Sequence, residues 1–356
     1  MDIEQFNYHL PERLIAQKPL TKRTDSRLLI LERDTGKWTH EKFVNITDYL
    51  KPGDCLVLND SKVIPVRLFG TKEETGAKIE VLLLHETEKV DEWEALVRPA
   101  RKIKLGDRVV FGKGELIATC TAIKEEGARC FRLEYEGIFL EVLDTLGEMP
   151  LPPYIKTQLE EKDRYQTVYA KEAGSAAAPT AGLHFTDALL KEIEAMGVRI
   201  AYVTLHVGLG TFRPITVERI DEHKMHAEYY CLQARDAKIL NEVKDSGGKI
   251  IAVGTTATRV LETVASAKDG KFNPQSGWTD IYIYPPYDFQ AIDGLITNFH
   301  LPKSSLLLLI SAFATKERIF SAYEEAIAKE YRFFSFGDVM FILPNDRTIN
   351  ETKGLK

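Results

Sequence analysis

Residues Thr186–Val207, TDALLKEIEAMGVRIAYVTLHV, place a helix signal directly before a strand signal. The Thr186 hydroxyl can accept a hydrogen bond from the first turn of a helix over Asp187–Met196. Gly197 marks the end of that helix, because glycine readily adopts the left-handed conformation that closes a helix. The β-rich run Val198–Val207 then predicts a strand. This succession of helix and strand is typical of an α/β domain.

The same alternation extends along much of the chain. Helices are predicted over Arg235–Lys244 and Thr255–Ala267, and strands over Lys249–Val253, Asp280–Tyr284 and Ile292–Asn298. Near the N-terminus, a helical start and two strands are predicted over Pro11–Gln17, Arg27–Glu32 and Cys55–Leu58. Strands joined through helices usually lie parallel, so we expect a largely parallel or mixed sheet with helices on its faces.

Residues 63–135 have a different pattern, in which short β-rich runs alternate with turn signals. The runs are Val63–Phe69, Ile79–Leu84, Trp93–Val97, Arg108–Phe111, Leu116–Ile123 and Cys130–Tyr135. This spacing is typical of a small all-β barrel or sandwich, and we expect a barrel. The residues before it are too few to fold alone. We therefore expect a discontinuous α/β domain of residues 1–62 and 152–356, with an inserted β-barrel domain of residues 63–151.

Composition limits the classes of function. The 356 residues are 44% hydrophobic and 28% charged, which is ordinary for a globular protein of two domains. The net charge of -6 excludes a globally basic nucleic-acid binder, so any nucleic acid would meet a local basic patch. The cysteines show no C-x-x-C spacing, which favours reduced thiols over disulfides or cysteine-bound zinc: Cys55, Cys120, Cys130 and Cys231.

Signals for export or membrane insertion are missing from the sequence. The segment Met1–Arg13 is acidic and has no apolar core. The longest apolar run, Leu306–Ala314, is far shorter than the roughly 20 residues that a bilayer span needs. We therefore expect a soluble, cytoplasmic protein.

Three segments carry a histidine beside glycine, proline or threonine at the end of an apolar run: Ala178–Thr186, Leu205–Phe212 and Thr297–Pro302. The ends of strands are where α/β proteins collect their chemistry, so these segments are the first candidates for a site. Gly208 and Gly210 allow the backbone to approach a ligand closely. They lack the third glycine and the following helix of a dinucleotide fingerprint, which disfavours an NAD site.

A possible anion site lies at Gly254–Arg259, which follows a predicted strand and opens a predicted helix. Backbone N–H groups, the hydroxyls of Thr255 and Thr256, and the Arg259 cation would converge there. The alternative is an ordinary threonine cap with a surface arginine.

His223, His226 and Glu228 raise the question of a metal site, because i and i+3 share a face if the segment is helical. The segment lacks the H-E-x-x-H spacing of zinc proteases, and no other segment supplies an evident ligand pair. Acid/base chemistry or substrate hydrogen bonding by His226 and Glu228 is favoured instead.

Further segments carry a resemblance to a known family: Phe6–Pro11, Asp25–Leu29, Val63–Gly70, Tyr165–Ala170 and Tyr331–Asp338. Together with the three histidine segments, they are similar to the S-adenosylmethionine:tRNA ribosyltransferase-isomerase family of the queuosine pathway. The similarity runs from the start of the chain to about Leu343. Lys62 stands where arginine is expected and Ser175–Ala176 where Ala-Val is usual, which weakens any bidentate phosphate contact at position 62.

The resemblance implies transfer of the ribosyl group of S-adenosylmethionine to 7-aminomethyl-7-deazaguanine at the tRNA wobble position. Isomerisation gives epoxyqueuosine, and adenine and methionine are released. S-adenosylmethionine is a consumed substrate, and no further cofactor, metal or membrane partner is implied. The target base lies in the single-stranded anticodon loop, so it can enter a pocket without the melting of a duplex.

The resemblance and the residue patterns together give three sets of candidates. The catalytic candidates are His184, His206, His226, His300 and Glu228. The substrate-binding candidates are Thr180, Gly182, Gly208, Gly210, Thr211, Arg213, Thr255, Thr256 and Arg259. The tRNA-binding candidates are Arg27, Arg67, Arg98, Arg101 and Lys102, for which solvated surface is the alternative. Which of the histidines is the general base stays open.

Two other classes of function are weighed against this one. A metal-dependent hydrolase would use His223, His226 and Glu228. A non-catalytic RNA-binding protein would suit the inserted β-unit, but it has no need of glycine-flanked histidines.

Overall fold

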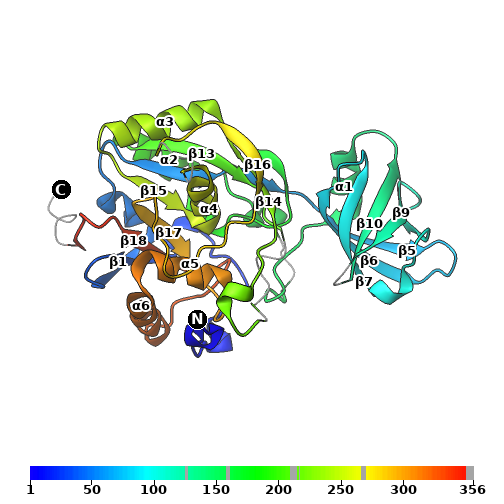
Figure 1. The fold of residues 1–356 in the computed structure, drawn as a ribbon, viewed down its shortest axis with the longest axis horizontal. Helices are drawn as coiled ribbons and strands as arrows, with labels where there is room; N and C mark the ends of the chain where they lie inside the picture. The colour runs from blue at the N-terminus through cyan, green and yellow to red at the C-terminus, as the bar shows by residue number, and fades with distance from the viewer. Residues whose placement is uncertain (125–126, 158–160, 209–214, 216, 266–269, 350–356) are drawn as a thin grey trace. The chain divides into compact units, whose positions relative to one another are not determined.

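The computed structural model describes residues 1–356 except 125–126, 158–160, 209–214, 216, 266–269 and 350–356. The chain forms two compact units (Figure 1). The first contains Met1–Ser61, Pro153–Glu172 and Ala178–Lys356, and the second contains Lys62–Pro152 and Ala173–Ala177. The short segment Ala173–Ala177 belongs to the second unit although the sequence assigned it to the α/β domain. There, the Ile64 N–H donates to the Ser175 carbonyl at 3.0 Å.

The first unit is built on a nine-stranded mixed sheet of order β16-β14-β13-β3-β15-β17-β18-β1-β2. Strands β13, β3, β15 and β17 run parallel, whereas β18 is antiparallel to β17. Strand β1 is parallel to β18, and the outer strands β2, β14 and β16 are antiparallel to their neighbours. The bounds are β1 Arg27–Glu32, β2 Trp38–Lys42, β3 Cys55–Asn59, β13 Arg199–Leu205, β14 Glu228–Leu232, β15 Ile250–Val253, β16 Gln275–Thr279, β17 Gly294–Asn298 and β18 Val339–Leu343.

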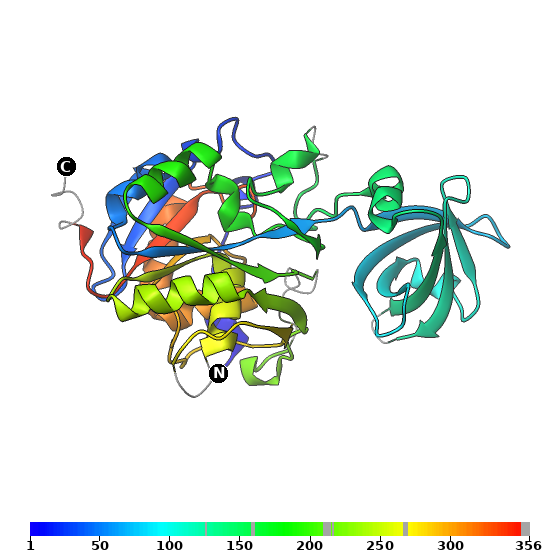
Figure 2. The same cartoon turned by 90° about the horizontal axis from the view of Figure 1, so that it is seen from above.

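The central strands are covered on both faces. Every residue of β3, β15, β17 and β18 is buried, and their largely apolar sequences reflect that burial. Helix α2 (Asp187–Ala195) and the 3-10 helix Phe43–Tyr49 close a core on one face. Helices α3 (Ala234–Asp245) and α4 (Gly254–Ala265) also contact the strands. Figure 2 shows α2 and α3 on opposite sides of the sheet.

The second unit is a closed antiparallel barrel. Its strands follow the order β5-β6-β7-β10-β9-β8, and pairing of β5 with β8 closes the ring, which leaves no free edge. Residues of β9 alternate between buried and more exposed, as expected where one face lines a small core. The bounds are β5 Arg67–Lys72, β6 Lys78–Glu86, β7 Glu92–Arg98, β8 Arg108–Phe111, β9 Leu116–Ile123 and β10 Ala128–Tyr135.

Smaller elements complete the barrel unit. Helix α1 (Phe139–Leu146) leads into β11 (Gly147–Glu148), which pairs with β5. A separate two-stranded ladder joins β4 (Ser61–Val63) to β12 (Glu172–Ser175).

The expected fold class is confirmed, as a mixed α/β sheet with a six-stranded barrel. Two element predictions are wrong. No strand forms over Asp280–Tyr284, and the strand of this region is β16 instead. Gly277 and the exposed Trp278 interrupt the pattern of buried β-rich residues by which a strand is recognised in a sequence. The helix expected over Pro11–Gln17 is reduced to the 3-10 turn Glu12–Leu14, because Ile15 already pairs with Phe333.

The sequence also left several elements of the first unit unassigned, including strands β2 and β14 and three elements near the C-terminal end. Helix α5 (Ser305–Ala314) is so apolar that it shows little periodicity, and nearly all of it is buried. Helix α6 (Lys316–Ala328) and strand β18 follow it. None of the helices among the described residues combines the length and apolar character that crossing a membrane requires.

Candidate active site

The carboxyl ends of the four parallel strands meet at one edge of the sheet, which is where open α/β sheets bind ligands. Strand β3 ends at Asn59, shortly before Ser61, and β13 is followed by His206. Strand β15 is followed by Gly254, and β17 leads to His300. Segments far apart in the sequence therefore converge at this edge.

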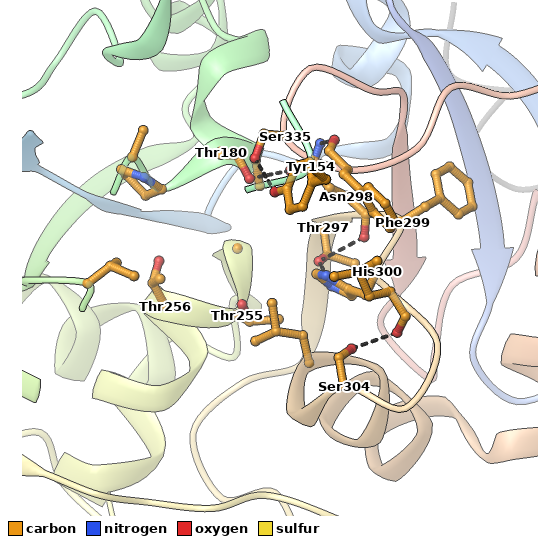
Figure 3. A pocket seen from close by; sticks show the side chains of 18 residues that line it. Tyr154, Thr180, Thr255, Thr256, Thr297, Asn298, Phe299, His300, Ser304 and Ser335 are labelled. Carbon is orange, nitrogen blue, oxygen red and sulfur yellow. Dashed lines mark hydrogen bonds between the residues drawn. The ribbon is translucent and has the colours of Figure 1, made fainter. Parts of the chain in front are cut away.

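A pocket of about 690 Å³, partly open to solvent, lies at this edge (Figure 3). No charged side chain of the described residues lines it. Its polar and aromatic lining consists of Tyr154, Thr180, Thr255, Thr256, Thr297, Asn298, Phe299, His300, Ser304, Phe334 and Ser335.

One wall of the pocket is the start of helix α4. Gly254 makes the turn from β15 into the helix with a φ of 89°, a conformation that favours glycine. The first N–H groups of a helix have no partner within it and carry partial positive charge. The Thr256 hydroxyl is enclosed and has no hydrogen-bond partner among the described residues. This end of the pocket therefore suits an anionic group.

Asn298, the last residue of β17, ties the opposite wall together. Its Oδ1 accepts a hydrogen bond from the Thr180 hydroxyl at 3.0 Å, and its Nδ2 donates to the Phe334 carbonyl at 3.2 Å. The same Nδ2 lies 3.3 Å from Nε2 of His184. This buried amide fixes three chain segments around the pocket.

His300 reaches the pocket lining and is almost completely buried. Its Nε2 lies 2.8 Å from the Thr297 hydroxyl, and its backbone N–H donates to the Tyr323 hydroxyl at 2.9 Å. Its carbonyl accepts a hydrogen bond from the Tyr8 hydroxyl. Burial lowers the pKa of His300 to about 3. His300 is therefore a neutral hydrogen-bonding group near pH 7.

His184 lies behind the pocket, at the end of the 3-10 turn Thr180–His184 rather than at the end of a strand as expected. Its Nδ1 is 2.8 Å from the Ser26 hydroxyl, and its Nε2 faces Asn298. Burial, assisted by the positive charges of Arg23 and Arg332, lowers the pKa of His184 to about 3. Both ring nitrogens are engaged, so this histidine holds neighbouring segments together.

His206 follows β13 and is only partly buried. Its Nδ1 lies 2.8 Å from the Ser61 hydroxyl, and its ring stacks on Tyr229 with centroids 5.5 Å apart. Its Nε2 has no hydrogen-bond partner among the described residues. Burial lowers the pKa of His206, and Glu172 opposes this shift. His206 does not itself line the pocket, but the next residue, Val207, does.

Glu228 and Arg259 form a buried ion pair, with each side chain 3% exposed. Glu228 Oε1 also accepts a hydrogen bond from the Gly208 N–H at 2.7 Å. Neither charged residue lines the pocket. The pair instead fastens the segment after β13 to helix α4.

His226 is exposed in an extended stretch before β14. The helix that would place His223 and His226 on one face is not formed, because residues 223–227 follow the short 3-10 turn Ile220–Glu222 without regular structure. Within the described ranges, no three His, Cys, Asp or Glu side chains gather closely enough to hold a metal ion.

Close packing explains why position 182 is a glycine. A Cβ there would lie 1.9 Å from the Tyr169 hydroxyl, so no larger residue fits without movement. Gly182 does not line the pocket. Gly210, Thr211 and Arg213 lie outside the described residues.

Comparison with known proteins shows the family to which this chain belongs. Residues 3–342 match a family described as queuosine biosynthesis protein. The chain belongs to the queuosine biosynthesis protein family. A solved structure from Thermotoga maritima, described as an S-adenosylmethionine tRNA ribosyltransferase, is 37% identical in sequence. The match covers 95% of this chain and 100% of that one, with a TM-score of 0.54, and the family expected from the sequence is confirmed.

Among the tRNA-binding candidates of this queuosine biosynthesis protein, two arginines form ion pairs within the protein. Arg27 pairs with Asp338 at 3.0 Å and stacks 4.2 Å above Tyr331. In the barrel unit, Arg67 donates to Glu80 at 2.8 Å.

The other three tRNA-binding candidates are on the barrel surface. Arg98 ends β7, and Arg101 and Lys102 belong to the adjoining 3-10 turn Ala100–Lys102. All three are exposed, and none has an ion pair with a described residue. They are the candidates whose charge is available to a partner.

Sequence reasoning missed several residues of this family member's site. Ser61, Asn298, Tyr154 and Ser335 were not singled out. The Tyr154 and Ser335 hydroxyls lie 2.7 Å apart in the pocket wall. Asn298 stands next to Thr297 at the end of a predicted strand, and that position was the available signal. Ser335 has no local pattern that separates it from an ordinary loop serine.

Proposed function

We propose that this protein transfers the ribosyl group of S-adenosylmethionine to 7-aminomethyl-7-deazaguanine at the tRNA wobble position and isomerises it to epoxyqueuosine. Adenine and methionine are the released products. The observation that carries this proposal is the uncharged pocket at the carboxyl ends of β15 and β17, in a chain of the queuosine biosynthesis family. We place the activity in the cytoplasm, with tRNA and S-adenosylmethionine as partners.

The donor would lie across the pocket with its carboxylate at the start of α4. The unpartnered Thr256 hydroxyl and the first N–H groups of the helix supply donors for an anion without a full positive charge. Thr180 and Thr255 supply further hydroxyls in the lining. The apolar remainder would exclude water from the sulfonium.

Among the histidines, we propose His206 as the general base. Abstraction of a proton from C5' of the donor, made acidic by the adjacent sulfonium, needs a neutral imidazole with a free ring nitrogen. His206 meets both conditions, since its pKa is lowered and its Nε2 has no partner among the described residues. His184 and His300 are weaker bases held in hydrogen bonds, and His226 is exposed in a loop.

Mass spectrometry of tRNA tests the proposal. Wobble-modified tRNA incubated with S-adenosylmethionine and this protein should gain the mass of the epoxycyclopentane ring, and adenine should appear in the supernatant. Tritium or carbon label in the donor ribose should move into tRNA. Label that stays in the donor would contradict the proposal.

A further inference from the structure

A second pocket of about 720 Å³, partly open to solvent, lies in the α/β unit beside β13. Two carboxylates and two tyrosine rings form its inner lining, and two exposed cationic side chains stand at its rim. The carboxylates are Asp60 and Asp236, the rings Tyr169 and Tyr202, and the cations Lys171 and Arg235.

In each carboxylate, only one oxygen accepts a hydrogen bond from a described residue. Asp60 Oδ1 accepts a hydrogen bond from the Thr204 hydroxyl at 2.7 Å, and Asp236 Oδ1 accepts from the Tyr202 N–H at 2.8 Å. The second oxygen of each has no donor among the described residues. Both residues are 6% exposed. A carboxylate oxygen that has no donor from the fold can accept one from a ligand, so the pocket favours a ligand that is cationic or rich in N–H donors.

The tyrosine rings favour a flat ligand. The centroids of Tyr169 and Tyr202 are 5.9 Å apart, with the ring planes inclined by 55°. Aromatic faces bind bases by stacking, and they also attract cations. Together with the carboxylates, they suit a planar heterocycle that bears a positive charge.

The end of β13 connects this pocket with the first one. Thr204 lines the second pocket and Val207 lines the first, and His206 lies between them in the chain. Asp60 precedes Ser61, whose hydroxyl fixes the His206 ring. The short segment Thr204–Val207 therefore contributes to the linings of both pockets.

We propose that this second pocket receives the acceptor base, a flat heterocycle with a primary ammonium group. This inference rests on the proposed function, which supplies such a base. Asp60 pairs with the ammonium group, Asp236 accepts from the N–H edge of the ring, and Tyr202 stacks on its face. Lys171 and Arg235, at the rim, meet the phosphates that flank the base.

Binding of two tRNAs that differ at one position tests the proposal. One carries 7-aminomethyl-7-deazaguanine at the wobble position, and the other carries guanine there. The full-length protein is titrated with each, without S-adenosylmethionine. Wild type should bind the aminomethyl tRNA more tightly. The isosteric variant Asp60→Asn should lose about tenfold or more in affinity for that tRNA and none for the guanine tRNA.

A matched control is Glu194→Gln, which removes an exposed carboxylate close enough to influence the pKa of Tyr202 but outside the pocket. It should retain the wild-type preference. S-adenosylmethionine affinity, measured by calorimetry, should be unchanged in both variants. Equal binding of the two tRNAs by wild type, or a preference that survives Asp60→Asn, would overturn the proposal.

A second pair of variants applies if Asp60→Asn does not fold. Tyr202→Leu removes the ring, whereas Tyr202→Phe keeps it, so only the first should weaken binding of the aminomethyl tRNA. Equal binding by the two would also overturn the proposal. Failure of the proposed function can be told apart from failure of this inference. In the first case, the protein would still prefer the aminomethyl tRNA but would transfer no ribosyl group to it.

Discussion

Hydrogen bonding to the ring nitrogens separates three histidines that look alike in sequence. His184 has partners on both nitrogens, and His300 is held by Thr297. His206 is oriented through Nδ1 by Ser61, and its Nε2 has no hydrogen-bond partner in the part of the chain that the structure describes. A general base needs this combination of fixed orientation and a free nitrogen.

Replacement of His206 by alanine should therefore lower turnover by about a hundredfold or more, with little change in donor affinity. Single-turnover kinetics and calorimetry measure the two quantities. Exchange of the C5' proton with solvent should disappear as well. Ser61→Ala should give a smaller loss, because it frees the ring without removing it.

A suitable control is His40→Ala, since His40 lies on β2 at the outer edge of the sheet and contacts Tyr331 and Glu325. Its turnover should stay near that of wild type. Near wild-type turnover in His206→Ala would instead place the base elsewhere.

The proposed donor site depends most directly on the start of helix α4. Thr256→Val keeps the shape of the side chain but removes the enclosed hydroxyl, so donor affinity should fall by about tenfold. Calorimetry with S-adenosylmethionine measures this. Thr263→Val is a control in the same helix, because the Thr263 hydroxyl bonds to the Arg259 carbonyl and to Thr279, away from the pocket. Equal affinities of the two variants would remove α4 from the donor site.

Elements with strong local signals could be predicted from the sequence, and those that depend on tertiary partners could not. Strand β1 was expected with its observed bounds, and helix α2 ends within one residue of the expected position. Strand β16 escaped notice because its pairing with β14, rather than its own composition, makes it a strand. The same holds for the site, since the histidine segments were visible but the Asn298 hydrogen bonds join residues far apart in sequence.

The proposed association with tRNA concerns the whole molecule, because its net charge of -6 leaves contacts with phosphates to exposed local cations. Replacing Arg98, Arg101 and Lys102 by alanine should make the dependence of log affinity on log salt shallower by about two to three units. Binding titrations at several salt concentrations measure the slope. Donor affinity should stay unchanged, and an unaltered slope would show that these side chains do not meet phosphates.

Stability against acid is a second property of the whole molecule, and it depends on the two buried histidines. His184 and His300 have pKa values lowered to about 3 in the folded protein, whereas an unfolded histidine titrates near pH 6.5. Between these values the unfolded chain binds more protons. The free energy of unfolding is therefore highest above about pH 6.5, and each histidine lowers it by up to ~1.4 kcal/mol per pH unit as the pH falls toward 3.

Urea denaturation at pH 7.5, 6.0 and 5.0 measures this dependence. His184→Asn removes one of the two groups. Its free energy of unfolding should be lower than that of wild type at pH 7.5. It should also decline less steeply as the pH falls, because unfolding then takes up about one proton fewer. His226→Gln, in the exposed loop before β14, should retain the wild-type slope. A His184→Asn curve that runs parallel to wild type would mean that His184 does not stay neutral in the folded protein, and its bonds to Ser26 and Asn298 would then have to accommodate an imidazolium.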